Sequence, residues 1–113
     1  SDADKVEDLL EIGNWLVESM DVPLKRVKSG IKFSQDKQVF YIDSQGRIIP
    51  THKKSVYEVK GDTLRIVDFK YEPRFLFEKG TLIALIKHLD NESIELDILH
   101  PEENKLILKK QKL

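Results

Sequence analysis

Turn-forming residues recur about every eight to twelve positions along this chain, and this spacing limits the fold more than any other feature of the sequence. Between the turns, apolar and polar residues alternate with period two, as they do in strands that bury one face. The expected turns lie at residues 21–23, 35–37, 43–46, 61–62, 79–80, 90–93 and 101–104. The expected strands cover residues 13–19, 30–34, 38–43, 47–50, 55–60, 63–69, 74–79, 82–89, 94–99 and 105–110. About eight to ten short strands at this spacing predict an all-β fold, an antiparallel sandwich or barrel, in which closure removes exposed sheet edges.

One segment of this pattern, TLIALIKHL at residues 81–89, fits two structures. Its apolar residues match one face of a helix as well as they match a strand. The DNES turn at residues 90–93 and the alternating apolar residues after it make a good hairpin partner. We therefore favour a strand at residues 82–89, with a helix as the alternative.

A short helix is expected ahead of the strands, at residues 2–11. Val6, Leu9 and Leu10 share one face of it, which should lie across an open end of the sheet. The chain begins at Ser1 without a methionine, and its first residues, SDADKVED, are acidic and polar. From this we expect an exported protein, periplasmic or held at the outer membrane or cell surface as a lipoprotein, with a membrane tether through a removed N-terminal segment. The alternative is a solvated helix start.

The composition indicates one soluble domain, residues 1–113, in which a helix or tether at 1–11 precedes a barrel at 12–110. Hydrophobic residues make up 40% of the chain and charged residues 35%, which is enough for one modest core under a polar surface. Lys and Arg total 19 against 20 for Asp and Glu, so no global field would attract nucleic acid, and we expect no nucleic-acid partner. No apolar run approaches the roughly 20 residues of a membrane span.

Four stretches, in this order along the chain, resemble lipocalins and their bacterial lipocalin-like relatives. The first is the G-x-W of Gly13-Asn14-Trp15, on the first expected strand. The others are IKFSQDKQVFYIDSQG at 31–46, YEVKGDTLRI at 57–66 and IKHLDNESIELDI at 86–98, which look like successive hairpins of the bacterial group. The resemblance implies an up-and-down β-barrel that belongs to a small secreted or lipoprotein-type binding protein. It also implies that a small apolar or amphipathic molecule is held inside the barrel.

The only tryptophan of the chain has a clear place in such a barrel. The ring of Trp15 would cover the floor, where its apolar body excludes water and its indole N–H can find a carbonyl. Gly13 would let a neighbouring segment approach closely or let the strand bend. The alternative is that Trp15 is a core residue of a β-sandwich.

Period two gives each expected strand an apolar inner face. On the third strand two faces, Val39 with Tyr41 and Phe40 with Ile42, are equally apolar, and both stay open. The candidate ligand-binding residues inside the barrel are Trp15, Phe33, Tyr41, Tyr57, Leu64, Ile66, Phe75, Phe77 and His88. The two tyrosines and the histidine of this set would orient a ligand. Alternatively, the hydroxyls of the two tyrosines lie at strand ends and the histidine lies on the solvent-exposed face of its strand.

Residue patterns typical of catalysis are absent from the sequence. His52, His88 and His100 are widely spaced, and none has a second ligand at metal-site spacing. The chain has no cysteine, no G-x-S-x-G and no glycine-rich phosphate loop. We therefore expect a protein that is not an enzyme and that uses no cofactor or metal. The alternative to a carrier is a filled-barrel module that binds another protein through its outer loops or an edge, with no small-molecule ligand.

Overall fold

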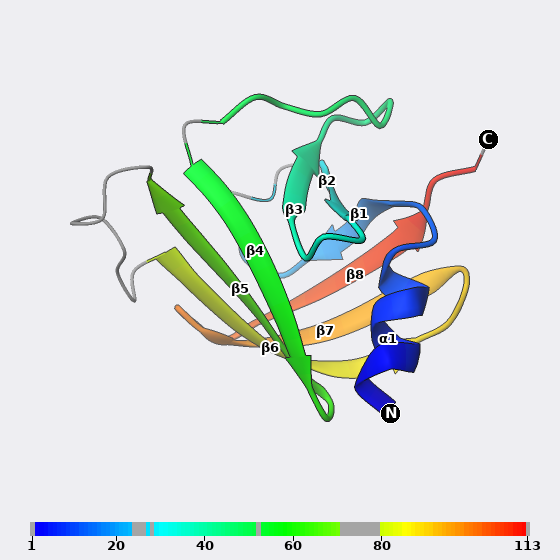
Figure 1. The fold of residues 1–113 in the computed structure, drawn as a ribbon, viewed down its shortest axis with the longest axis vertical. Helices are drawn as coiled ribbons and strands as arrows, with labels where there is room; N and C mark the ends of the chain where they lie inside the picture. The colour runs from blue at the N-terminus through cyan, green and yellow to red at the C-terminus, as the bar shows by residue number, and fades with distance from the viewer. Residues whose placement is uncertain (1, 24–26, 28, 52, 71–79, 113) are drawn as a thin grey trace.

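A computed structural model describes residues 2–23, 27, 29–51, 53–70 and 80–112, and Figure 1 shows its ribbon. Within these residues, one helix precedes eight strands. The elements are α1 (Asp2–Leu10), β1 (Asn14–Met20), β2 (Gly30–Phe33), β3 (Val39–Ile42), β4 (Lys53–Lys60), β5 (Thr63–Lys70), β6 (Thr81–Leu89), β7 (Ser93–His100) and β8 (Asn104–Lys110). The predicted all-β fold with a short N-terminal helix is confirmed. The strand expected at residues 74–79 lies outside the described residues.

The strands form an up-and-down barrel that is nearly closed. Neighbours in the sheet are antiparallel, in the order β3-β2-β1-β8-β7-β6-β5-β4. Apart from β1 with β8, paired strands follow one another in the sequence. Near α1, β3 and β4 are joined by a bridge between Gln38 and Val56 and by a 2.9 Å hydrogen bond from the Tyr57 amide to the Lys37 carbonyl. From there the two strands diverge and leave a seam (Figure 1).

The strand expected at residues 47–50 is not formed, and this prediction is wrong. The chain instead turns back along β3, where Ile48 bridges Ile42 and the next residue donates its amide hydrogen to a β3 carbonyl over 2.8 Å. The pairing ends there because Pro50 has no amide hydrogen with which to continue a ladder. Residues 43–49 are therefore a hairpin attached to the edge of β3.

The segment that fits both a helix and a strand is strand β6, which pairs with β5 on one side and β7 on the other. The preferred interpretation is therefore confirmed. The register between β6 and β7 shifts twice, between Ile83 and Ala84 and between Ile86 and His88. Such bulges interrupt the period of two. They explain why the apolar residues of this segment also fit a helical face.

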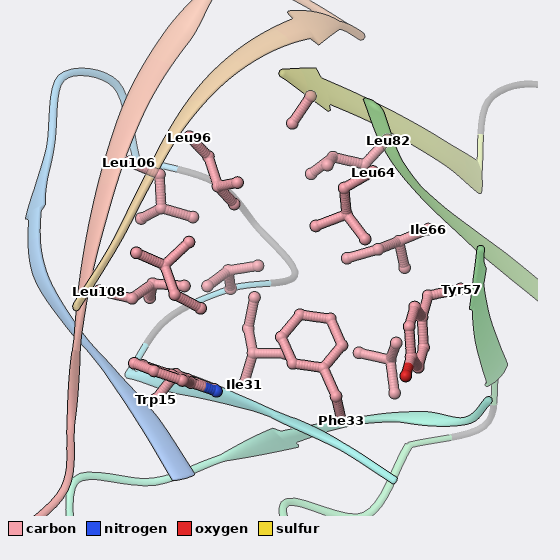
Figure 2. Packing of buried hydrophobic residues seen from close by; sticks show 14 of the residues in the cluster. Trp15, Ile31, Phe33, Tyr57, Leu64, Ile66, Leu82, Leu96, Leu106 and Leu108 are labelled. Carbon is pink, nitrogen blue, oxygen red and sulfur yellow. The ribbon is translucent and has the colours of Figure 1, made fainter. Parts of the chain in front are cut away.

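Buried apolar side chains from every strand and from α1 form one core cluster inside the barrel (Figure 2). Its members are Leu10, Trp15, Val27, Ile31, Phe33, Val39, Tyr41, Tyr57, Val59, Leu64, Ile66, Leu82, Ala84, Ile94, Leu96, Ile98, Leu106 and Leu108. On β3 the inner face is Val39 with Tyr41. Phe40 is half-buried, and Ile42 is buried on the opposite face of the strand beside Gly30. The structure thus chooses between the two faces that the sequence leaves open.

The end of the barrel next to α1 is closed by the helix and by the tryptophan. Trp15 is fully buried, and its indole Nε1–H donates a 2.8 Å hydrogen bond to the carbonyl of Leu10, the last residue of α1. Leu10 is itself fully buried in the core. On the outer side of the helix, Glu7 forms an ion pair with Lys37 of the β2–β3 turn. As the sequence predicts, the ring of Trp15 covers this end of the barrel and its indole N–H is hydrogen-bonded to a backbone carbonyl.

Candidate functional site

Most of the residues expected inside the barrel are there. Buried members of the core cluster include Trp15, Phe33, Tyr41, Tyr57, Leu64 and Ile66. Figure 2 shows several of these side chains, from β1, β2, β4 and β5, pointing into one shared space. The alternation in the sequence therefore correctly groups residues from distant strands. Phe75 and Phe77 lie outside the described residues.

The inward placement of His88 is wrong. Its side chain is 52% exposed, and its Nε2 lies 2.8 Å from an Asp90 carboxylate oxygen. Simple alternation with Ala84 and Ile86 would turn His88 into the barrel. The register shift between Ile86 and His88 changes which residues face inward, so the imidazole lies over the following turn instead.

We expect the carboxyl group of Asp90 to titrate with a pKa of about 2, below its ordinary value of 3.8. Backbone hydrogen bonds from Glu92 and Ser93 lower this pKa most, and the side chain of His88 lowers it further. Because folding depresses the pKa, the ionised carboxylate stabilises the folded turn above pH 3.8, and this contribution is lost as the pH falls through about 2. NMR of the carboxyl carbon against pH measures the midpoint directly.

The His88→Ala variant separates the two causes of this shift. Its Asp90 midpoint should rise but stay below 3.8, because both backbone hydrogen bonds remain. A midpoint near 3.8 in the folded native protein would show that the turn does not hold the carboxylate as described.

One part of the described barrel interior is filled by protein. A void large enough for water would leave part of its wall accessible, yet Trp15, Leu64, Ile94 and Leu108 are 0% exposed and Ile66 is 1% exposed. A ligand among these side chains would have to displace them. Other residues of the inner face retain some exposure, such as Tyr41 at 7%, and space for a small molecule lies beside this residue.

The hydroxyl group of Tyr57 is hydrogen-bonded within the fold. Its ring contacts that of Phe33 edge to face, with centroids 5.0 Å apart and planes 75° apart. Its hydroxyl donates a 2.9 Å hydrogen bond to the carboxylate of Glu11, directly after α1. Burial raises the pKa of Tyr57, and the hydrogen bond to Glu11 raises it further, so the hydroxyl stays protonated. This tyrosine therefore fastens the helix to β4.

The inner face is reached from outside at the seam between β3 and β4. A cleft of about 390 Å³ lies there, beyond the bridge between Gln38 and Val56. Its lining residues are Gln38, Val39, Phe40, Tyr41, Ile48, Ile49, Pro50, Thr51, Lys54 and Ser55. Val39 and Tyr41 belong to the inner face of the barrel, so this seam cleft leads from the surface to the core.

The outer wall of the seam cleft is the hairpin of residues 43–49. The carboxylate of Asp43 orders its turn by accepting 2.9 Å hydrogen bonds from the amides of Gln45 and Arg47 and from the Arg47 side chain. These bonds, with that from the Arg47 amide foremost, lower the pKa of Asp43. The hairpin holds Ile48 and Ile49 at the cleft with 49% and 37% of their surface exposed.

Gly46 fixes where the tip of this hairpin lies. The tip packs against the amide side chains of Asn14 and Gln111, which are hydrogen-bonded to each other over 3.0 Å. A Cβ at position 46 would lie 2.3 Å from the Gln111 side-chain oxygen, and the φ of +87° favours glycine. The D-S-Q-G turn therefore ties the cleft wall to the start of β1 and to the segment after β8.

Sequence reasoning missed most of the seam cleft. Assigning a strand to residues 47–50 concealed the hairpin, although the basic stretch His52-Lys53-Lys54 by itself suggests a charged rim that would attract an acidic headgroup. The pattern that could have revealed the hairpin is the pair of adjacent isoleucines followed by Pro50, because it breaks period two directly after a turn.

A second hollow, of about 990 Å³, lies outside the barrel near the end of α1 and the C-terminal segment. Its charged lining residues are Glu11, Glu18, Lys32, Glu92, Lys109, Lys110 and Lys112. Charges of both signs are interspersed around this wide hollow, and we find no feature there that would select one ligand. We therefore take the smaller seam cleft, which reaches the core, as the candidate site.

The described residues offer no metal centre and no membrane-spanning helix. Among them, no three His, Asp or Glu side chains are grouped so that they could hold a metal ion. Within the described ranges, no helix is long and apolar enough to cross a membrane. The arrangement at the seam is suited to holding a molecule by contact and hydrogen bonding.

Comparison with known proteins supports the fold. No family model matches the chain, and no curated protein matches it. The structure is similar to the crystal structure of a lipocalin-like protein from Bacteroides uniformis ATCC 8492, with a TM-score of 0.58 and 18% sequence identity. The match covers 89% of this chain and 98% of that one. The resemblance seen in the sequence is thus confirmed at the level of architecture, and this chain has a lipocalin-like fold.

Proposed function

We propose that this protein is a non-enzymatic binding protein that holds a small apolar or amphipathic molecule in the seam cleft, against the inner-face residues Val39 and Tyr41. The observation that carries the proposal is the cleft itself. Its volume of about 390 Å³ lies within the range of about 300 to 1,000 Å³ that is usual for small-molecule sites. Half of its lining is apolar, and the remainder offers a few polar groups that can orient a ligand.

The filled interior supports this location for the ligand. Displacing side chains that are almost fully buried in a packed core costs several favourable contacts at once. The seam requires no such displacement, because β3 and β4 already diverge there (Figure 1). The barrel is therefore the scaffold, and the ligand binds at the seam between β3 and β4.

Native mass spectrometry of gently purified protein, beside the same sample denatured, tests the proposal even though the ligand is unidentified. A non-covalent adduct of small-molecule mass that is lost on denaturation would support a carrier, and its fragmentation would begin to identify the ligand. A bare mass from several expression hosts would weigh against it.

Replacing Ile48 with serine should weaken binding of the neutral fluorescent probe N-phenylnaphthylamine (NPN) by about five- to tenfold, because an apolar part of the cleft wall is lost. Fluorescence titration measures the dissociation constant. Leu99→Ser is the matched control, since Leu99 of β7 is as exposed as Ile48, at 49%, and is not part of the cleft lining. Equal effects of the two variants, or none, would place NPN elsewhere and contradict the proposal.

The filled interior also favours a second candidate function, a structural or interaction module without a small-molecule ligand. Such a protein would bind a protein partner through its exposed loops or its β3 and β4 edges. It would give a bare mass in the native spectrum and no saturable NPN binding. Export of the protein, with or without a membrane tether, is a separate proposal that rests on the acidic, polar first residues, and fractionation of the producing cells tests it.

A further inference from the structure

Lys54 is the only charged side chain among the described residues that line the seam cleft. It is exposed at the start of β4, on the side of the cleft opposite the hairpin that carries Ile48 and Ile49. Within the described ranges, no carboxylate forms an ion pair with its ammonium group. Among its described lining residues, the cleft therefore combines an apolar wall with one cation that forms no ion pair with a described carboxylate.

Asp36, an acid whose pKa Lys54 lowers, is engaged elsewhere. The carboxylate of Asp36 accepts hydrogen bonds from the Ser34 hydroxyl and, over 2.9 Å, from the Gln38 side chain. The Ser34 hydrogen bond is the largest cause of the lowered pKa of Asp36, and Lys54 is the smallest of its causes. Asp36 is thus held in the β2–β3 turn, and the ammonium group of Lys54 can pair with another anion.

We propose that the ligand of the seam cleft is an organic anion with an apolar body, and that Lys54 binds its charged head. This inference rests on the proposed function and specifies its ligand class. The apolar body lies between the inner-face residues Val39 and Tyr41 and the hairpin that carries Ile48 and Ile49, and the charged head lies beside Lys54. An ammonium group on a flexible stem acts as a point charge, so it suits a carboxylate or a sulfonate equally. A cation or a neutral amphiphile would gain nothing from this side chain.

Two fluorescent probes of the same shape test the inference. Anilinonaphthalene sulfonate (ANS) and NPN share an apolar aromatic frame, and only ANS carries a negative charge. Lys54→Met keeps most of the apolar stem and removes the charge. We expect it to weaken ANS binding about three- to fivefold, as for an exposed ion pair, and to leave NPN binding within about twofold. Lys60→Met is the control, because Lys60 is exposed at the other end of the same strand and is not part of the cleft lining.

A salt titration of the native protein gives a second readout that needs no variant. Raising the ionic strength should weaken ANS binding and leave NPN binding nearly unchanged, and Lys54→Met should lose this difference. If Lys54→Met leaves ANS binding unaltered, or weakens both probes equally, the anionic head is wrong. If Ile48→Ser still weakens NPN in that case, the cleft remains the site. If neither probe responds to Ile48→Ser, the proposed function itself fails.

Discussion

Replacing Trp15 with alanine should lower the free energy of unfolding by about 3–5 kcal/mol, the usual range for removing a large aromatic side chain from a core. The whole side chain is buried, so its loss leaves a cavity at the floor of the barrel. The change also removes the 2.8 Å hydrogen bond from Nε1 to the Leu10 carbonyl and so loosens the end of α1. Urea denaturation followed by circular dichroism measures the loss.

Two further variants make this result specific. Trp15→Phe keeps most of the ring and removes the N–H, so it should cost less than the alanine variant and report mainly on the hydrogen bond. Leu16→Ala changes the adjacent, half-buried residue of β1, which is not in the core cluster, and should cost the least. A Trp15→Ala variant as stable as Leu16→Ala would show that the tryptophan does not form the floor.

Replacing Gly30 with alanine should destabilise the fold by about 1–3 kcal/mol, as overpacking of a well-packed site usually does. A Cβ at this position would lie 2.4 Å from the backbone carbonyl oxygen of Trp15 and 2.9 Å from a side-chain carbon of Ile42. The backbone oxygen can move away only if β1 and β2 separate, and these strands pair at this point, with Gly30 opposite Leu16. Thermal unfolding and amide exchange of β2 would detect the effect.

The matched control is Gly13→Ala, directly before β1. A Cβ there would meet only the Lys110 side chain, at 3.2 and 3.3 Å, and a long flexible side chain can move aside at little cost. We expect this variant to remain close to the native protein in stability. Equal losses at the two glycines would mean that the tight approach of β1 and β2 is not what Gly30 provides.

The fold could be predicted because most strands obey a local rule. Where one face of a strand is buried, period two appears in the sequence, and it correctly places Trp15, Phe33, Tyr57 and Leu64 in one core. The tight turns are equally local, since each depends on a few polar or glycine residues next to one another. No information from distant parts of the chain was needed for either.

The errors arise where distant parts of the chain decide the outcome. The bulges between β6 and β7 turn His88 outward, and no local pattern in the sequence predicts such a register shift. Ile42 is buried although it faces away from the barrel, so apolar character alone could not identify the inner face of β3. The seam cleft depends on how far β3 and β4 diverge, which is a property of the whole closed sheet.

The position of β8 in the sheet has a consequence for how the chain matures during synthesis. β8 alone links the group β3-β2-β1 to the group β7-β6-β5-β4 by strand pairing on both of its sides. Without residues 104–110, the two groups would be joined by the chain between β3 and β4 and by the bridge between Gln38 and Val56. Pairing between the first and last strands is also the contact with the largest sequence separation, and such contacts form slowly. We therefore expect the sheet to close only once residues 104–110 are available to pair with both β1 and β7.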